Sequence, residues 1–587
     1  MNWDLSKLYR GFDDVQFTSD MKRLEEMIQG VDSQLQSLPE QTDDVNQIKT
    51  LLKDINAVSD LLGRLNAFVF LTLAADANCE AALAPHDRVL KLANEAEIMM
   101  SAFVRWCGAN PALVDLCEKD DELRAYLPLV RSAVERARHL IDPSLEREVR
   151  EMQLSGGKAW MRLRDELFAG LSIRLTLKGE EKELPLSAVR NLTFDADPTV
   201  REAAFRAELA AYPRIETAMA ACLNGIKGEA LTMARLQHYD SVLDWSLTQA
   251  RMDRSTLDAL TEAIRESYPA FRRYFSMKAR ALGCKKLKFC DLFAPLGSSD
   301  KRYTLGEAKE ILLDVFSGFH APIAEVMRRA FDERWIDAYP RAGKEGGAFC
   351  EGVHQLKMSY VLTNFEGSYS DVSTLAHELG HAFHDNMMRD VPALLTDIPM
   401  PLAETASTFN ELLLCEKVLS AADKDEQLTI LESQISDAAQ CIVDIMSRFL
   451  FESAVVEARK TRTLSARELK EMMIEAQKET YGDAMDEEML HPYMWACKSH
   501  YYDTLYHFYN YPYAFGILFG AGLNALRKQM GEAFWPMYEN LLRFSGAGTV
   551  REVAASVGID VGNVDFWRSA LRQYTDKIDF LGTLLGQ

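Results

Sequence analysis

The chain is poor in cysteine and lacks long apolar runs. Ten Cys are scattered over 587 residues without a Cys-x-x-Cys pair, which excludes a disulfide scaffold and is typical of a reduced compartment. No apolar run reaches the roughly 18 to 20 residues that a membrane span needs; the longest candidate, 515–526, is interrupted by three glycines. The first nine residues lack the basic segment and apolar stretch of a signal peptide. We therefore expect a cytoplasmic protein.

Basic residues are also fewer than acidic ones. Lys and Arg total 66 against 88 Asp and Glu, which gives a formal net charge of −22. A surface of that charge repels nucleic acid and anionic lipid, because both bind clustered Lys and Arg. We therefore expect no nucleic-acid partner and no membrane partner, while the composition leaves the oligomeric state open.

Proline and glycine are rare in the first 150 residues, where apolar residues recur at helical spacing. The pattern predicts helices over 20–38, 44–74, 80–109 and 111–137. It is interrupted at 154–158 and again at 175–186, where Lys178-Gly179-Glu180-Glu181 has the composition of a hairpin tip.

A helical run resumes at Thr199, after Asp197-Pro198, and we place a domain boundary near residue 195. Strand composition occurs at 346–350 and 358–365, and a late loop at 545–549 precedes a final helical tail. The prediction is a mainly α protein, with a helical N-terminal domain (1–195) and a mostly helical second domain (196–587) that contains a small β-sheet.

The most informative segment is 375–384, which reads Leu-Ala-His-Glu-Leu-Gly-His-Ala-Phe-His. His377 and His381 are four residues apart, so a helix places both imidazoles on one face, where they can share a Zn²⁺ ion. Glu378 can reach a metal-bound water and is the candidate general base. The alternative is a pair of solvated histidines on a helix face beside a charge.

Helical spacing of apolar residues supports a helix here. The residues that form this apolar face are Val372, Leu375, Ala376, Leu379 and Phe383. Ser370 or Asp371 is expected to cap the start of the helix.

A third ligand is expected because zinc hydrolases usually take three protein ligands and leave one position for water. No Glu occurs between Ala382 and Ala403, and Pro401 then opens a new helix that carries Glu404 and Glu411. Glu404 is the predicted third ligand, and Glu411 the predicted acceptor that orients a ligand histidine. The two roles could be exchanged.

His384 is the competing third ligand, because it lies three residues beyond His381 on a similar face. Three histidines on one straight helix have poor geometry for a tetrahedral ion. We interpret His384 as a residue that packs beside the ligands or hydrogen-bonds to them.

A cluster of His and Tyr lies far downstream. Eight of the 14 residues from His500 to Tyr513 are His or Tyr. Peptide hydrolysis needs donors aimed at a developing oxyanion, and both residue types supply them. The alternative is a half-buried helix face with its hydroxyl groups at the surface.

At this point the sequence resembles the oligoendopeptidase F and thimet oligopeptidase family of zinc metallopeptidases, most strongly the oligoendopeptidase F branch. The likeness spans nearly the whole chain, and the His-Glu-x-x-His motif with a Glu 23 residues after its second His is the most specific part. The segments that carry it are Trp3–Ser6, Asp197–Phe205, Gly347–Cys350, Ser359–Leu362, Asp371–His384, the Glu404 helix, Ser545–Gly548 and Gly558–Asp560.

The resemblance implies a role for each residue that matches the family's motif. His377, His381 and Glu404 would bind one Zn²⁺, and Glu378 would be the general base. His500 and Tyr509 would stabilise the oxyanion. The remaining residues that we expect to contact the substrate, some of which could exchange roles with His500 or Tyr509, are Tyr360, Tyr502, Tyr506, His507, Tyr511 and Tyr513.

The implied function is that of a zinc-dependent oligoendopeptidase acting on oligopeptides. In the family, a deep cleft or channel admits short unstructured peptides and excludes folded proteins. The strand Ser359–Phe365, if it is a sheet edge, could hold an extended peptide by main-chain pairing.

Two other functions stay open. A zinc carboxypeptidase is one, because a basic residue for the terminal carboxylate could come from anywhere in the chain. An inactive peptide-binding scaffold is the other, although Glu378, His377 and His381 are all present. An aminopeptidase is disfavoured, because the strand Val361–Phe365 lacks the Glu that would bind a free amine. The sequence does not specify the cleavage-site preference.

Overall fold

A computed structural model describes residues 1–39, 42–297 and 301–587, and the chain divides into two compact units. Unit 1 comprises 1–140, 301–418 and 526–559, and unit 2 comprises 141–300, 419–525 and 560–587. Each unit therefore draws on three separate segments of the chain. The boundary that we placed near residue 195 stays a prediction.

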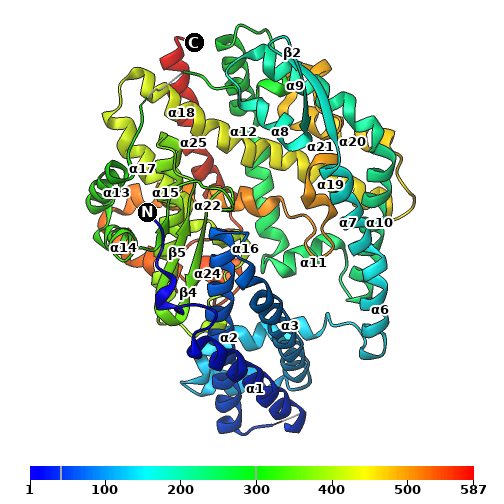
Figure 1. The fold of residues 1–587 in the computed structure, drawn as a ribbon, viewed down its shortest axis with the longest axis vertical. Coiled ribbons are helices and arrows are strands. Elements are labelled where there is room, and N and C mark those ends of the chain that lie inside the picture. The colour runs from blue at the N-terminus through cyan, green and yellow to red at the C-terminus, as the bar shows by residue number, and fades with distance from the viewer. Residues whose placement is uncertain (40–41, 298–300) are drawn as a thin grey trace. The chain divides into compact units, whose positions relative to one another are not determined.

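Both units are mainly helical, as expected. The helices and strands of unit 1 are α1 (Val15–Ser37), α2 (Val45–Ala75), α3 (Glu80–Ala109), α4 (Ala112–Lys119), α5 (Leu127–Ala137), α13 (Leu305–Phe319), α14 (Ala321–Asp332), β3 (Ile336–Asp337), β4 (Phe349–Val353), β5 (Met358–Leu362), α15 (Tyr369–Met388), α16 (Met400–Ala403), α17 (Thr405–Ala421), α23 (Phe534–Arg543) and α24 (Val550–Ala555) (Figure 1).

The helices and strands of unit 2 are α6 (Pro143–Ser155), α7 (Gly157–Ala169), β1 (Ser172–Leu177), β2 (Glu180–Pro185), α8 (Leu186–Asn191), α9 (Pro198–Ala211), α10 (Glu216–Leu236), α11 (Val242–Gln249), α12 (Arg254–Ala281), α18 (Lys424–Ala439), α19 (Ile445–Arg459), α20 (Ala466–Tyr481), α21 (Met494–Cys497), α22 (Tyr511–Met530) and α25 (Val564–Leu585). The expected hairpin is confirmed: β1 and β2 pair antiparallel, and both turn residues, Lys178 and Gly179, have positive φ, as a type I′ turn requires.

The first helices of unit 1 follow the sequence pattern with one exception. The observed α1, α2 and α3 match the predicted segments 20–38, 44–74 and 80–109 closely. The predicted single helix over 111–137 is wrong, because α4 and α5 are separated at 120–126. The carboxylate of Asp120 accepts hydrogen bonds from the backbone N–H groups of Glu122 and Leu123, each at 3.0 Å, and so favours a turn over a continued helix.

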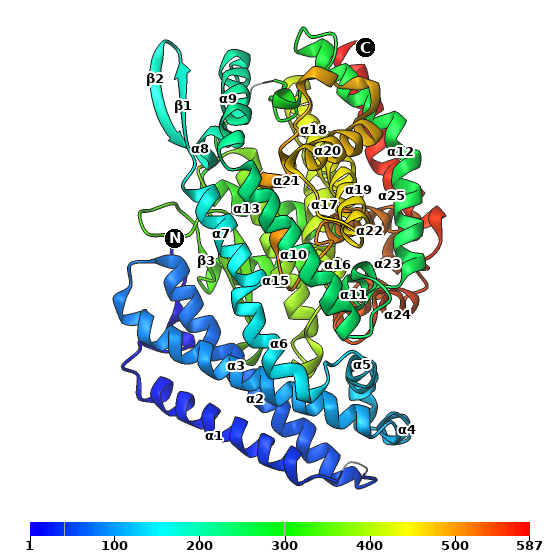
Figure 2. The same ribbon diagram turned by 90° about the vertical axis from the view of Figure 1, so that its right-hand side faces the viewer.

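Helix α2 is the one described helix that is long and apolar enough to cross a membrane by length and composition. It packs against α1 and α3, and the three lie side by side (Figure 2). The apolar residues of α2 are therefore used for helix packing within unit 1.

The sheet of unit 1 has the order β3-β5-β4, with β3 parallel and β4 antiparallel to β5. Strand β5 is central and every residue in it is buried. The suggestion that 359–365 forms a sheet edge is therefore wrong, and among the described strands the unpaired edge near the metal-site helix belongs to β4. Helix α15 packs against both β4 and β5.

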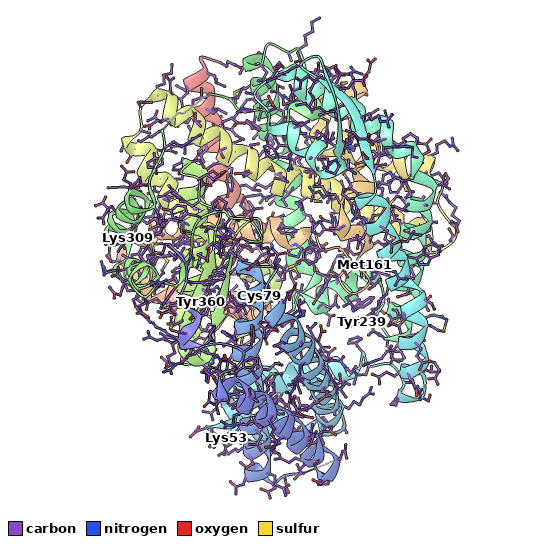
Figure 3. The ribbon with its side chains drawn as sticks, in the orientation of Figure 1. Lys53, Cys79, Met161, Tyr239, Lys309 and Tyr360 are labelled. Carbon is purple, nitrogen blue, oxygen red and sulfur yellow. The ribbon has the colours of Figure 1, made fainter. Side chains whose placement is uncertain are left out.

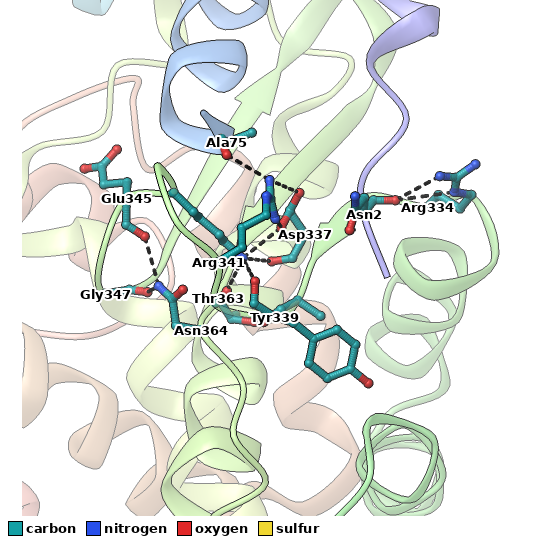
Figure 4. Close-up of polar contacts among 12 residues, drawn as sticks. Asn2, Ala75, Arg334, Asp337, Tyr339, Arg341, Glu345, Gly347, Thr363 and Asn364 are labelled. Atoms are coloured by element: carbon teal, nitrogen blue, oxygen red, sulfur yellow. Dashed lines mark hydrogen bonds and ion pairs between the residues drawn. The ribbon is translucent and has the colours of Figure 1, made fainter. Parts of the chain in front are cut away.

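The loop that leads into β4 is fixed by side chains that bind backbone carbonyl groups. Arg341 pairs with Asp337 and donates to the carbonyl oxygen of Ala75 at 2.9 Å, while the Asn364 amide donates to two carbonyl groups of the loop (Figure 4). The ammonium of Lys344 is fully buried and donates to three carbonyl oxygens and to the Asp337 carboxylate. These bonds hold the entry to β4 in one arrangement.

Candidate metal centre

Helix α15 begins with a capping box. Ser368 accepts a hydrogen bond from the backbone N–H of Asp371 at 3.1 Å, and the Asp371 carboxylate accepts one from the N–H of Ser368 at 2.8 Å. The prediction that Ser370 or Asp371 is the cap is corrected: Ser368 is the N-cap and Asp371 closes the box. The predicted apolar face is confirmed, since Val372, Leu375, Ala376, Leu379 and Phe383 are all buried.

A glycine lets a second helical segment approach α15 closely. A Cβ placed on Gly380 would lie 2.6 Å from the Cα of Ser407 and 2.7 Å from the carbonyl oxygen of Ala406. Pro401 lies in the first turn of α16, and Glu404 occupies the break between α16 and α17 rather than the interior of one helix. The close contact at Gly380 therefore brings Glu404 beside the histidines of α15.

His377, His381 and Glu404 form a compact triangle of ligand atoms. His377 Nε2 and His381 Nε2 are 3.3 Å apart, and Glu404 Oε2 lies 3.2 Å from the first and 3.4 Å from the second. All three residues are partly exposed. Two imidazole nitrogens and a carboxylate oxygen, converging on one point, can hold a metal ion.

Hydrogen bonds orient two of these ligands. His377 Nδ1 is hydrogen-bonded to Glu411 Oε1, which leaves Nε2 directed at the common point. Ser407 donates to Glu404 Oε2 at 2.8 Å. Burial would lower the pKa of His377, but the hydrogen bonds of Glu404 and Glu411 raise it well above its usual value. Glu411 is predicted from the sequence, but Ser407 is not, because its only signal is its position three residues after Glu404.

Glu378 lies between the two histidines and is 6% exposed. Burial raises the pKa of its carboxyl group, while His377 and His381 oppose that shift. A carboxylate with a raised pKa accepts protons more readily, which suits a general base.

His384 does not point to the same centre. It is 1% exposed, and its Nε2 lies 2.7 Å from the Ser545 hydroxyl. Burial lowers the pKa of its imidazole to about 3. The structure therefore places His384 as a packed, neutral residue with a hydrogen bond of its own.

A second group of potential ligands among the described residues is Glu208, His491 and Cys497 in unit 2. Here Arg190 Nη1 lies 2.5 Å from Glu208 Oε1 and already supplies a positive charge to that carboxylate. His491 and the hydroxyl of Tyr212 also bond the same oxygen. This group is an ion-pair network.

The His and Tyr stretch lies in unit 2 and is not one helix face. Residues 500–510 are a short 3₁₀ turn followed by irregular chain, and α22 begins only at Tyr511. Tyr506 is 45% exposed and Tyr513 is 37% exposed, whereas His500 and Tyr509 are half-buried. Because the backbone is irregular, with a positive φ at Phe508, some side chains of the stretch are exposed and others are buried.

The partly accessible side chains form one aromatic cluster. His500 and Tyr509 stack, with ring centroids 5.1 Å apart and planes 10° apart. The Tyr513 hydroxyl lies 3.5 Å from His500 Nε2, and Tyr506 meets Tyr509 edge to face. Burial, together with Arg448 and Lys498, lowers the pKa of His500 to about 4, so its imidazole is neutral at pH 7.

Four residues that we expected to contact substrate are buried, and their contact with substrate stays a prediction. Tyr360, on β5 (Figure 3), is 0% exposed and donates to the carbonyl oxygen of Asp4 at 2.9 Å. Tyr502, His507 and Tyr511 are at most 3% exposed. Their side chains build the core of their own units, so Tyr506, Tyr509, Tyr513 and His500 remain as candidates.

Comparisons with known proteins identify a family of peptidases. Residues 191–572 match the model of Peptidase family M3. The chain is 27% identical to the Group B oligopeptidase PepB of Streptococcus agalactiae over 70% of this chain and 68% of that protein, and 26% identical to a chromosomal oligoendopeptidase F of Lactococcus lactis over 69% and 67%.

Solved structures share the fold. A Chlamydophila abortus protein described as a peptidase superposes with a TM-score of 0.84 at 23% identity, covering 99% of this chain and 98% of that one. The oligoendopeptidase-F of Enterococcus faecium superposes with a TM-score of 0.68 at 20% identity, covering 97% and 99%. The mainly α fold of this chain is therefore the fold of these proteins.

Proposed function

The chain belongs to peptidase family M3 and to its oligoendopeptidase F branch, and from that premise we propose that it is a zinc-dependent endopeptidase that cleaves internal bonds of short, unstructured peptides. Family membership makes it a metallo-oligopeptidase. The identity of the metal, the roles of individual residues and the substrate class are the content of the proposal. We also propose that it acts in the cytoplasm.

The observation that carries the proposal is the spacing of the three ligand atoms. Ligands at 2.0–2.1 Å from a tetrahedral zinc ion lie about 3.3 to 3.4 Å from one another. The distances between His377 Nε2, His381 Nε2 and Glu404 Oε2 are 3.2, 3.3 and 3.4 Å. Two imidazoles and one carboxylate are also the donor set of catalytic zinc, and three protein ligands leave a fourth position open. The residues therefore fit this ion.

Zinc held by these residues would supply Lewis acidity, which lowers the pKa of water to about 7 and polarises a carbonyl group. Glu378 accepts the proton that the attacking water loses and passes it to the leaving amine. Its burial favours both steps, because a carboxyl group with a raised pKa both takes and returns a proton near neutral pH. Glu411 and Ser407 keep His377 and Glu404 in the orientation that binding requires.

The oxyanion donors in this proposal are Tyr509 and His500. The assignment rests on resemblance, and it is supported by the partial exposure of both side chains and by their stacking. A neutral His500 keeps one N–H to donate, and the Tyr509 hydroxyl supplies another. Donors of this kind stabilise the charge that develops on the carbonyl oxygen.

The edge strand β4 is the element that we propose pairs with an extended peptide. Its inner edge is used by β5, from Phe349↔Leu362 to Val353↔Met358. Main-chain pairing at the other edge would hold a peptide without regard to its side chains. That would suit an enzyme that acts on many short peptides.

The test is digestion of an internally quenched peptide library read by mass spectrometry, with and without a chelator. We expect internal cleavage that stops on chelation and returns with zinc. Glu378→Gln should retain zinc and lose activity by on the order of 10²-fold or more, while Glu366→Gln, an exposed carboxylate nearby, should behave as wild type. Cleavage only at C-termini would favour a carboxypeptidase, and binding of peptides without cleavage would favour a scaffold.

A further inference from the structure

Unit 2 contains a cavity of about 220 Å³ that includes none of the proposed catalytic residues. Its lining combines three cationic side chains, Arg190, Arg448 and Lys498, with two acidic ones, Glu208 and Asp444. We call it the cation cavity. Its charges do not balance, because three positive groups face two negative ones.

Both carboxylates of the cation cavity are already hydrogen-bonded by protein groups. Glu208 Oε1 pairs with Arg190 at 2.5 Å and accepts a hydrogen bond from the Tyr212 hydroxyl at 2.7 Å. Asp444 pairs with Arg448 and accepts from the Tyr481 hydroxyl at 3.1 Å. The acids therefore need no further cation, and a metal ion or amine is a poor ligand here.

Two of the cationic side chains, Lys498 and Arg448, have N–H groups that donate no hydrogen bond to the described residues. No hydrogen bond or ion pair to Lys498 Nζ occurs within the part of the chain that the structure describes. The Arg448 side chain is 5% exposed, and its Nε is buried without a partner among those same residues. Lys498 is half-buried, and Arg448 pairs with Asp444 while its Nε bonds none of the described residues. An anionic acceptor in the cavity would give each group a further partner.

The rest of the wall is largely apolar. Phe205 and Phe289 stack with centroids 6.3 Å apart, and Phe275 and Tyr481 pack 5.4 Å apart. Aromatic walls and a cationic spot suit an organic molecule with an apolar body and a single negative charge, and a volume of about 220 Å³ limits it to a small one. An inorganic ion would leave the aromatic surface empty.

We propose that the cation cavity is a binding site for an organic carboxylate with an apolar body, whose carboxylate lies against Lys498 and Arg448. The same chemistry is presented by the C-terminal end of an apolar peptide and by a free apolar acid. No metal takes part, and the site is separate from the catalytic residues proposed above.

The state of Lys498 supports the assignment. Burial and the neighbouring Arg448 lower the pKa of its ammonium to about 8. The other charged or titratable groups around it are Asp444 and Cys497, which oppose the shift, and Arg190, which adds to it. A bound carboxylate would raise this pKa, so binding would take up protons near pH 8 and weaken as the pH rises above 8.

A ligand in the cation cavity would also change the electrostatic environment of His500, in the segment that follows Lys498. Lys498 directly precedes the 3₁₀ turn Ser499–Tyr502, which contains His500. Arg448 and Lys498 contribute to the lowered pKa of His500, after burial. Neutralising them with an anion would raise that pKa and change the pH profile of any reaction in which His500 takes part.

The experiment is isothermal titration of the zinc-loaded protein with 3-phenylpropanoate, a free acid, and N-acetyl-L-phenylalanine, a peptide terminus. We expect saturable binding of both, with 3-phenylpropanamide, the neutral counterpart, at least tenfold weaker. The acid that binds more tightly shows whether the natural ligand is a free apolar acid or the C-terminal end of a peptide. The affinity should fall by on the order of tenfold between pH 7 and pH 9.5.

Two variants locate the site and one serves as a control. Lys498→Met should weaken binding at least tenfold without lowering the melting temperature, because the half-buried ammonium that is removed makes no hydrogen bond or ion pair to the described residues. Ala439→Phe, at a small lining residue, should block binding while Lys498 stays in place. Lys460→Met, at an exposed lysine of the same unit paired with Glu457, should bind as wild type.

Carboxylates also bind zinc, so the titration is repeated after the metal is removed with a chelator. Binding that persists supports the proposal, and binding that disappears with the metal overturns it. The proposal also fails if neither acid binds, if the amide binds as well as the acids, or if both Lys498→Met and Ala439→Phe leave the affinity unchanged.

Discussion

The metal centre of unit 1 and the His and Tyr stretch of unit 2 differ in how far their polar side-chain atoms are hydrogen-bonded. In the metal centre, Glu411 bonds His377 and Ser407 bonds Glu404. His377 lies within α15, which begins with a capping box, and Glu404 lies at the break between α16 and α17. In the stretch 500–510, several buried polar atoms have no partner among the described residues. They are His500 Nδ1, the hydroxyl groups of Tyr501 and Tyr502, His507 Nε2 and both amide atoms of Asn510.

The difference separates two ways to build a functional region. A metal site needs its ligands in place before the ion arrives, so surrounding hydrogen bonds hold them. A segment with unmet hydrogen-bonding groups carries a cost that a packed core rarely tolerates. Such a segment is suited to a region whose hydrogen bonds are completed by water or a bound molecule.

The largest expected effect is on metal retention. Glu404→Ala removes a ligand atom and should empty the site on dialysis, with a loss of affinity beyond the roughly 10- to 100-fold typical of an outer partner. His384→Ala removes a residue bonded to Ser545 instead and should retain metal. Atomic spectroscopy after dialysis measures both. The assignment fails if His384→Ala empties the site while Glu404→Ala stays loaded.

The next largest effect is a fall in kcat caused by substitution in the His and Tyr stretch, residues 500–513. Tyr509→Phe removes one donor to the oxyanion and should lower kcat by about 10²- to 10³-fold with little change in KM, full zinc and an unchanged melting curve. Phe variants of Tyr502, Tyr506, Tyr511 and Tyr513 are compared side by side. Because Tyr502 and Tyr511 are buried, we expect little loss of turnover from them. If another variant falls while Tyr509→Phe stays active, the stretch is catalytic but the assigned residue is wrong.

A smaller effect on zinc affinity tests whether the hydrogen bond from Glu411 is needed to orient His377. Glu411→Gln keeps the shape of the side chain but weakens its hydrogen bond to His377, and should lower zinc affinity by about 10- to 100-fold. A competition titration with a chelator measures it. Glu416→Gln, on the same helix but paired with Arg527, is the control and should keep wild-type affinity. Equal affinity in both variants would show that His377 needs no orienting partner.

The smallest effect concerns stability and has opposite signs in two tyrosines of unit 2. The Tyr501 hydroxyl is buried without a described partner, so Tyr501→Phe should leave the free energy of unfolding unchanged or raise it by up to about 1 kcal/mol. The Tyr212 hydroxyl donates to Glu208, so Tyr212→Phe should lower it by about 1 kcal/mol. Denaturant titration compares them. A loss in Tyr501→Phe as large as that in Tyr212→Phe would mean that its hydroxyl does have a partner in solution.

The pairing of two histidines on one helix face could be predicted from the sequence, because it depends on local periodicity. His377 and His381 share a face through helical spacing alone, and the buried face of α15 follows the same rule. The contribution of Gly380 could not be predicted, because it depends on which backbone meets it from 26 or more residues away. Ser407 was missed for another reason: it is local to Glu404, but a serine three residues away carries no pattern that marks it as a hydrogen-bond donor.

The stretch 500–513 was harder because no period applies to it. Irregular backbone and a positive φ at Phe508 decide which side chains are buried, and composition carries no signal for either. Tyr360 shows the related limit for strands: β5 is central and covered, a property of the strand order and not of its own five residues. Helices α1 to α3 were predicted from apolar spacing, and the hairpin and the late loop from Gly and other turn residues, because all of these signals are local.

The interleaving of the two units has a consequence for biosynthesis. Unit 1 needs residues 526–559, and these leave the ribosome about 20 to 80 seconds after residue 140 at typical elongation rates of about 5–20 residues per second. Helices α1 to α3 can pair during that interval, since they contact one another. Helix α15 is synthesised before α23, against which it packs, and before Ser545, which bonds His384. The nascent chain therefore carries one side of α15, the side that packs against α23, without its partner until translation is nearly complete, although β4 and β5 are already available to cover the rest. A nascent-chain chaperone would be expected to bind that side.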